Sequence, residues 1–91
     1  MTEEKFEERK GEHHHKTVTI FVNGRPEKVE KGKISYDKVV EFAYPKPDYE
    51  QFTYKVTYFR KDDKREGVLT KGESVEVSEE MSFTVNRSFR S

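Results

Sequence analysis

The sequence contains no cysteine and no tryptophan, and neither sign of charge prevails in it. Without cysteine the chain has no disulfide, no thiol nucleophile and no thiolate metal site. Its 18 basic and 18 acidic residues give a formal net charge of zero, so overall charge does not favour nucleic acid or an anionic membrane as a partner. No stretch reads as a secretion signal or is apolar enough to span a bilayer. These absences predict a cytoplasmic protein with neither nucleic acid nor membrane among its partners.

Apolar residues are scarce as well, since 31% of the chain is hydrophobic while 40% is charged. Such a composition is typical of disordered chains when the apolar residues are scattered. Here they recur at strand spacing, and seven Phe and five Tyr supply large rings in place of leucine and isoleucine. The 91 residues therefore predict one domain with a small core.

The first sixteen residues, MTEEKFEERKGEHHHK, mix both signs of charge with a single aromatic residue, Phe6. This composition predicts a disordered charged tail over residues 1–16. His13 to His15 could bind a transition metal weakly, but adjacent residues do not close a tetrahedral site by themselves. A solvated tail is favoured, and we expect no metal and no cofactor.

From Thr17 onward the pattern becomes that of a β-hairpin. Val18, Ile20 and Val22 alternate with residues of the opposite face. The pair Asn23-Gly24 suits the positive φ angles of a type I′ turn, and residues 25–30 form the returning strand.

A helix is expected after the hairpin. Ser35 is a suitable N-cap, and Pro45 and Pro47 stop the helix near Tyr44. One face carries apolar residues at helical spacing, namely Tyr36, Val39, Val40 and Ala43.

The rest of the chain predicts further strands. Residues 52–59 alternate, with Tyr54, Val56 and Tyr58 on one side. The charged run 60–66, ending at Gly67, indicates a solvated loop, and short extended pieces follow at 68–69 and 75–77. A last strand places Met81, Phe83 and Val85 on one side. The order predicts an α+β fold, a mixed sheet of four to five strands packed on one helix over residues 17–86, with a flexible tail at 87–91.

Five segments, TVTIFVNGRP, KISYDKVVEFA, YKVTYF, GVLTKGESVEV and MSFTVNRSFRS, together resemble the bacterial multiubiquitin-type domain, a ubiquitin-like β-grasp module. The resemblance covers residues 17–91 in a single copy. It implies a ubiquitin-like protein modifier found with a ubiquitin-like activating enzyme, a conjugating enzyme and a processing peptidase, in bacterial conjugation systems linked to phage defence. The protein targets are not implied by it.

The C-terminal residues differ from those of ubiquitin and sulfur carriers, which end in a Gly-Gly tail that threads an adenylating site. Here no glycine follows Gly72. The expected conjugation tail consists of Arg87, Ser88, Phe89, Arg90 and Ser91. Three interpretations stay open: the tail is trimmed before use, the partner enzymes accept bulky residues, or the chain is a non-conjugated adaptor or self-assembling module.

A partner-binding face is predicted on the side of the sheet away from the helix. Phe21 alternates out of phase with Ile20 and Val22, so it falls on that side. The predicted face consists of Phe21, Thr19, Lys55, Thr57 and Phe59. The acidic pairs at 62–63 and 79–80 are interpreted as solvated loop charges, and since no nucleophile, base or carboxylate pair stands at a catalytic spacing, we expect no enzyme.

Overall fold

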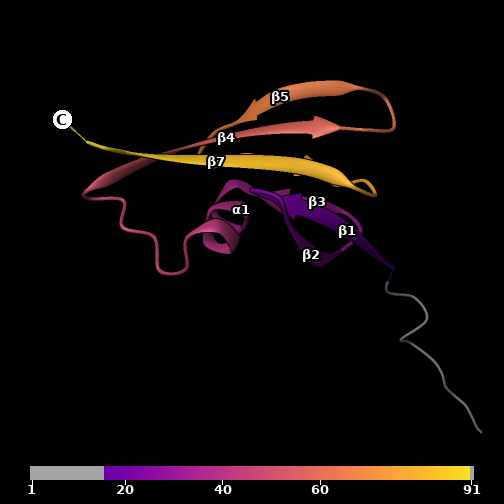
Figure 1. The fold of residues 1–91 in the computed structure, drawn as a ribbon, viewed down its shortest axis with the longest axis horizontal. Coiled ribbons are helices and arrows are strands. Elements are labelled where there is room, and N and C mark those ends of the chain that lie inside the picture. The colour runs from indigo at the N-terminus through magenta and orange to yellow at the C-terminus, as the bar shows by residue number, and fades with distance from the viewer. Residues whose placement is uncertain (1–15, 91) are drawn as a thin grey trace, which may run out of the picture.

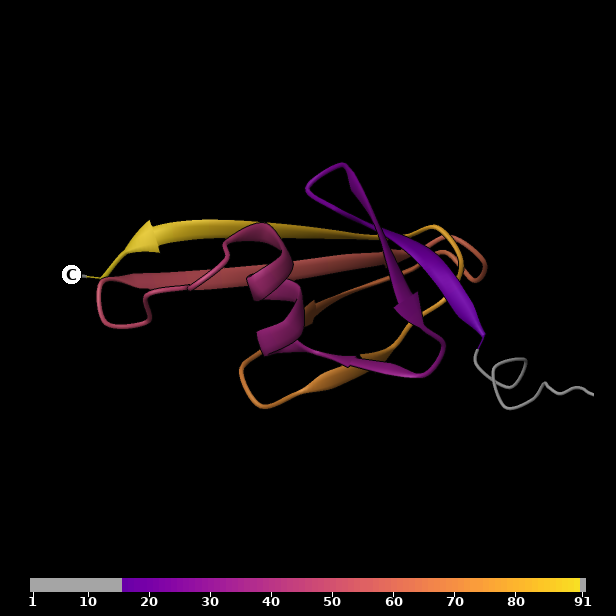
Figure 2. The same ribbon diagram turned by 90° about the horizontal axis from the view of Figure 1, so that it is seen from below.

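The computed structural model describes residues 16–90, which form one five-stranded sheet, a small two-stranded sheet and one helix (Figures 1 and 2). The elements are β1 Thr17–Val22, β2 Arg25–Glu30, β3 Lys33–Ser35, α1 Tyr36–Ala43, β4 Phe52–Arg60, β5 Arg65–Leu69, β6 Ser74–Glu76 and β7 Met81–Phe89. Apart from Lys16, the predicted N-terminal tail with its three histidines lies outside the described residues.

The strand order of the large sheet is β2-β1-β7-β4-β5. The first strand, β1, runs parallel to the last, β7, while β1–β2, β4–β7 and β4–β5 are antiparallel. The predicted α+β class, with a mixed sheet and one helix, is confirmed. Strand β3, which pairs with β6 in the small sheet, was not expected, because three residues are too few to show an alternation.

The hairpin has the predicted turn. Asn23 and Gly24 take φ values of 52° and 84°, and Val22 pairs directly with Arg25, as a two-residue type I′ turn requires. Asn23 does more than turn the chain: its backbone N–H donates to the Phe83 carbonyl at 2.9 Å. The turn is thereby attached to the central strand β7.

The helix begins as predicted, because the Ser35 Oγ accepts a hydrogen bond from the Lys38 N–H at 3.2 Å. It ends at Ala43, with Tyr44 in an extended conformation before the prolines. Tyr36, Val39 and Val40 are buried on its inner face, and Ala43 is half-buried.

The core lies between α1 and the inner face of the large sheet. Its buried residues are Ile20, Val22, Ile34, Tyr36, Val39, Val40, Tyr54, Val56, Leu69, Val77, Met81, Phe83 and Val85. Figure 2 shows α1 crossing beneath the middle of β4 and β7, so that the ends of these two strands extend beyond the helix as a ribbon. That projecting ribbon includes the C-terminal residues.

The charged loop is shorter than predicted. Instead of spanning 60–66, the turn occupies residues 61–64, because Arg60 still belongs to β4 and pairs with Arg65 of β5. Gly67 lies within β5 opposite Tyr58. A β-carbon at Gly67 would stand 2.5 Å from the Tyr58 hydroxyl, so the glycine makes room for the tyrosine ring rather than ending a loop.

The C-terminal boundary was also predicted wrongly. Strand β7 does not stop at residue 86, since it pairs with β4 through Arg87↔Tyr54, Ser88↔Thr53 and Phe89↔Phe52. The Arg90 N–H continues the ladder by donating to the Gln51 carbonyl at 2.8 Å. Residues 87–89 of the expected flexible tail are therefore strand, while Ser91 lies outside the described residues.

Candidate functional site: the outer sheet face and the end of β7

Two phenylalanines of the predicted face lie in one row across the sheet. Ser82 of β7 pairs with Phe21 of β1 on one side and with Phe59 of β4 on the other. With about 4.8 Å between neighbouring strands, the two aromatic residues stand about 10 Å apart across a small serine. The next residues along the face are small and polar, since Thr57 pairs with Thr84.

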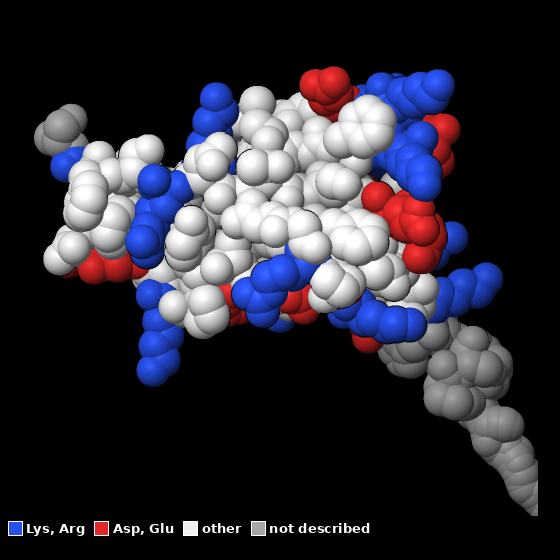
Figure 3. Space-filling model, in the orientation of Figure 1, with Lys and Arg blue, Asp and Glu red and all other residues white. Residues whose placement is uncertain are grey.

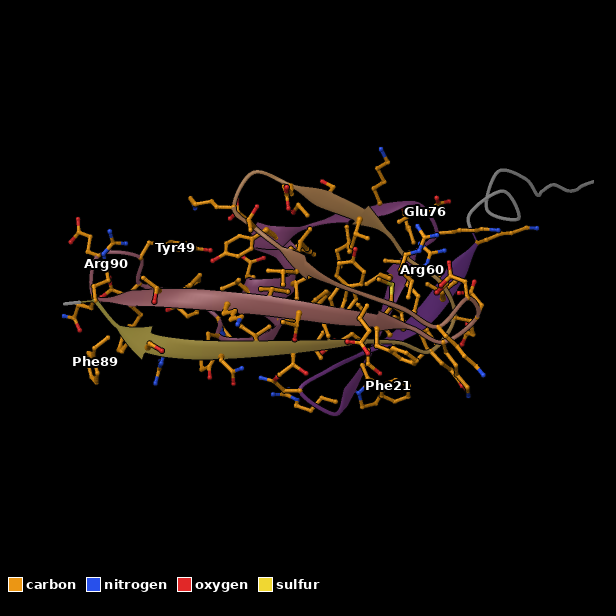
Figure 4. The ribbon with its side chains drawn as sticks, turned by 90° about the horizontal axis from the view of Figure 1, so that it is seen from above. Phe21, Tyr49, Arg60, Glu76, Phe89 and Arg90 are labelled. Carbon is orange, nitrogen blue, oxygen red and sulfur yellow. The ribbon has the colours of Figure 1, made fainter. Side chains whose placement is uncertain are left out.

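The outer face is hollowed beside Phe59. A cavity of about 480 Å³ is lined by Thr57, Tyr58, Phe59, Glu66, Gly67, Val68, Ser82 and Thr84. Phe59 is 39% exposed and Val68 54%, whereas Phe21 is half-buried and lies next to β7 (Figure 4). Val68 was not predicted as part of this face, although its alternation with the buried Leu69 was the signal that could have placed it there.

Thr19 and Lys55 lie farther from this hollow. Thr19 shares the outer side of β1 with Phe21 and pairs with Lys28, two residues along the strand from Phe21. Lys55 pairs with Asn86, toward the projecting ribbon. The structure therefore brings Phe21, Thr57 and Phe59 together around Ser82, and leaves the other two at opposite margins.

The acidic pairs of the loops are engaged with neighbours. The Arg60 Nε lies 3.6 Å from an Asp63 oxygen and 3.8 Å from an Asp62 oxygen, and the Glu79 carboxylate accepts from the Thr19 N–H at 3.3 Å. Lys61 donates to Glu80 at 2.6 Å, and this hydrogen bond raises the pKa of Lys61 and lowers that of Glu80. Within residues 16–90 no group of three or more potential ligands is placed to hold a metal ion.

Figure 3 shows where charge lies on one side of the molecule. Acidic and basic groups gather at the right-hand end, while an area without charged residues covers the middle. At the left-hand, C-terminal end basic groups are again present, with an acidic area at the lower margin.

Arg87 is held on the inner side of the projecting ribbon by two aromatic rings. Its guanidinium carbon lies 4.6 Å from the ring centre of Tyr44 and 4.3 Å from that of Phe52, within the range of cation–π attraction. Phe89 packs on the same Phe52 ring, with centroids 4.8 Å apart. The strand continues beyond the predicted boundary at residue 86 because an arginine stacked between two rings occupies the next inward position after Val85.

Arg90 also contacts this end of the molecule. Its Nη1 donates to the Tyr49 carbonyl at 3.1 Å, and Figure 4 shows Tyr49, Phe89 and Arg90 gathered there. The ring of Tyr49 in turn packs edge-on against Tyr54, with centroids 5.3 Å apart. Arg90, which was expected in a free conjugation tail, is thus bonded to the loop after α1.

The Tyr49 hydroxyl has a strongly raised pKa. Burial raises its pKa to about 12, and the Asp37 carboxylate, which accepts from the Tyr49 hydroxyl at 3.4 Å, adds to the effect. The pKa of Tyr36 is raised by burial and by the same carboxylate. Lys71 lies beside Asp37 and Tyr49: its Nζ is 3.5 Å from an Asp37 oxygen and 3.9 Å from the centre of the Tyr49 ring.

We expect the Asp37→Asn variant to lower the pKa of Tyr49 without restoring its ordinary value, because burial remains. The Tyr49 hydroxyl keeps its proton up to about pH 12 in the folded chain, whereas in the unfolded chain it loses the proton near pH 10. The free energy of unfolding should therefore fall as pH rises between these values. A spectrophotometric titration of tyrosinate, with Tyr49→Phe to assign the transition, measures the shift. Glu41→Gln on the same helix is the control, and an unchanged pKa in Asp37→Asn would contradict the assigned contact.

A mixed sheet in which the first strand lies parallel to the last, with one helix packed on its inner face, defines a ubiquitin-like β-grasp protein. The family model described as Multiubiquitin matches residues 18–88, and the chain belongs to the multiubiquitin family. No curated protein and no solved structure matched the chain. No helix in the described part of the chain is long and apolar enough to cross a membrane.

Proposed function

We propose that this chain is a ubiquitin-like protein modifier, joined to protein targets in a bacterial conjugation system that serves antiviral defence. Membership of the multiubiquitin family over residues 18–88 carries the proposal. The proposed partners are an adenylating activating enzyme, a conjugating enzyme, a processing peptidase and protein targets in the cytoplasm. The chain itself is proposed to have no enzymatic activity.

The chemistry needs only a carboxylate from this chain. An oxygen of the C-terminal carboxylate attacks the α-phosphorus of ATP, which forms an acyl adenylate and releases pyrophosphate. A nucleophile of the enzyme or target then attacks the acyl carbon and displaces AMP. The partner enzymes supply the catalytic groups, while the outer face around Phe21, Ser82 and Phe59 serves as the recognition surface, with a partly exposed ring as its anchor.

The position of β7 adds a condition to this mechanism. Phe89 is still paired with Phe52, and the Arg90 N–H is bonded to the Gln51 carbonyl, so the chain up to Arg90 is held at the sheet rather than extended toward a partner's active site. The end of β7 therefore has to separate from β4 during activation. The stacking of Arg87 between Tyr44 and Phe52 opposes that separation.

Pyrophosphate exchange with the proposed activating enzyme tests the proposal. We expect exchange with the full chain and a large loss in a chain that ends at Ser88. Tyr44→Ala should increase the exchange rate, because it removes one ring that holds Arg87.

Phe59→Ala should raise the KM of the activating enzyme for this chain at least about tenfold while changing the stability of the fold by about 1 kcal/mol or less. Thr53→Ala on the same face is its control.

Absence of exchange with the full chain, using an activating enzyme shown to be competent with another substrate, would sink the modifier hypothesis. The second candidate is then a non-conjugated adaptor or self-assembling module. One observation favours it: residues 87–89 are already paired in the sheet and held by aromatic rings rather than presented as a tail.

A further inference from the structure

The projecting end of β7 has an open edge. The Asn23 side-chain amide bonds both backbone groups of Val85, donating to its C=O at 3.2 Å and accepting from its N–H at 2.8 Å. Residues two apart in a strand turn their backbone groups to the same edge, so Arg87 and Phe89 face the same way as Val85. Among residues 16–90 no strand pairs with β7 on this side beyond Phe83. Figure 4 shows that this half of β7 borders no other strand there.

The opposite edge of the ribbon is closed by local contacts. The Tyr54 carbonyl of β4 accepts from the Tyr36 hydroxyl at 2.7 Å, and the Phe52 N–H donates to the Asp48 carbonyl at 3.0 Å. A strand that adds to the ribbon therefore has to add beside Arg87 and Phe89. An uncovered strand edge is a template for pairing with another chain.

The side chains along the open edge determine what fits it. Phe89 is 78% exposed and contacts the Phe52 ring on one side only. Arg87 touches ring faces, and no carboxylate in residues 16–90 pairs with it. Because neighbours on one face of a strand are two residues apart, the complementary strand carries an apolar residue beside Phe89 and an acid beside Arg87, at a spacing of two.

We propose that residues 3–8 of a second copy of this chain, Glu-Glu-Lys-Phe-Glu-Glu, complete this edge. In an extended conformation the segment would place Glu4, Phe6 and Glu8 on one side. The pattern is symmetric about Phe6. With Phe6 beside Phe89, Glu4 lies beside Arg87 if the added strand is parallel to β7, and Glu8 lies there if it is antiparallel. The proposal holds whether or not the chain is conjugated.

A second copy fits better than the chain's own N-terminal segment. Figure 1 places the start of β1 and the C-terminal end at opposite ends of the molecule, so a chain's own segment would have to return along the whole length. Donation from one copy to the next is a head-to-tail contact, which produces a ring if the rotation between copies closes and an open-ended assembly if it does not. An edge of three residues buries little surface, so the association is weak and concentration-dependent.

Sedimentation velocity of the full chain over a range of concentrations tests the proposal. The mean mass should rise with concentration, and added salt should weaken the rise. Arg87→Glu should lower the association constant at least about tenfold, which corresponds to 1.4 kcal/mol. Lys33→Glu, the same charge change on β3, should leave it unchanged. Phe6→Ser should lower the association constant as much as Arg87→Glu does. Because Phe6 lies outside the described domain, this loss would not be due to misfolding.

A peptide of residues 1–12 identifies the site directly. Titrated into the full chain, it should shift the amide resonances of Arg87 and Phe89 and reduce the mean mass by capping the edge. A scrambled peptide of equal composition should not. In the Arg87→Glu variant, a peptide with lysine at positions 4 and 8 should restore binding.

Four outcomes would overturn the proposal. The full chain could stay monomeric at every concentration without binding the peptide, or the shifts could fall on another surface. The scrambled peptide could bind equally well, which would indicate an edge that accepts any acidic chain. Finally, Phe6→Ser could change the Arg87 amide of a strictly monomeric chain, which would indicate that each copy uses its own segment.

Discussion

The Val39→Asp variant is expected not to fold. Val39 has no exposed surface and lies at the centre of the contact between α1 and the sheet. An unpaired carboxylate in that position costs several kcal/mol, which is comparable to the whole stability expected of so small a domain. Circular dichroism at room temperature should show loss of structure, and thermal scans should show no cooperative transition.

The matched control is Lys38→Asp. This neighbouring position is exposed on the same helix, and an acidic residue is favourable in the first turn. The control should melt close to the unaltered chain. A Val39→Asp variant that melts within a few degrees of the control would show that the inner face of the helix has been assigned wrongly.

The second large effect is expected at Asn23. Its amide bonds the N–H and C=O of Val85, and its φ of 52° lies where alanine is disfavoured by about 1 kcal/mol or more. The Asn23→Ala variant loses both side-chain hydrogen bonds, each worth about 1 kcal/mol, and adds backbone strain. A total loss of about 2–4 kcal/mol should appear in urea denaturation.

Asn23→Gly separates the two contributions, because glycine accepts the positive φ and still lacks the amide. It should lie between the unaltered chain and Asn23→Ala in stability. Equal stability of all three proteins would mean that the contact with Val85 does not stabilise the fold. Equal stability of the two variants would assign the whole loss to the hydrogen bonds.

The local elements of this protein could be predicted from the sequence because their causes are local. Alternation of Val18, Ile20 and Val22, the Asn23-Gly24 turn and the Ser35 cap act within a few residues of one another. Each prediction is confirmed by a feature that depends on near neighbours: the register of β1 with β2, the two positive φ angles and the bond from the Lys38 N–H. The mixed sheet on one helix followed from the order of these elements.

The tertiary structure decided which residues meet. Pairing of β7 between β1 and β4 places Phe21 and Phe59 on either side of Ser82, and no spacing in the sequence reveals that row. Pairing with β4 likewise extends β7 to Phe89, because the rings of Tyr44 and Phe52 make an inward position acceptable to Arg87. An arginine reads as solvent-exposed in a sequence, since its aromatic neighbours are brought together only by the fold.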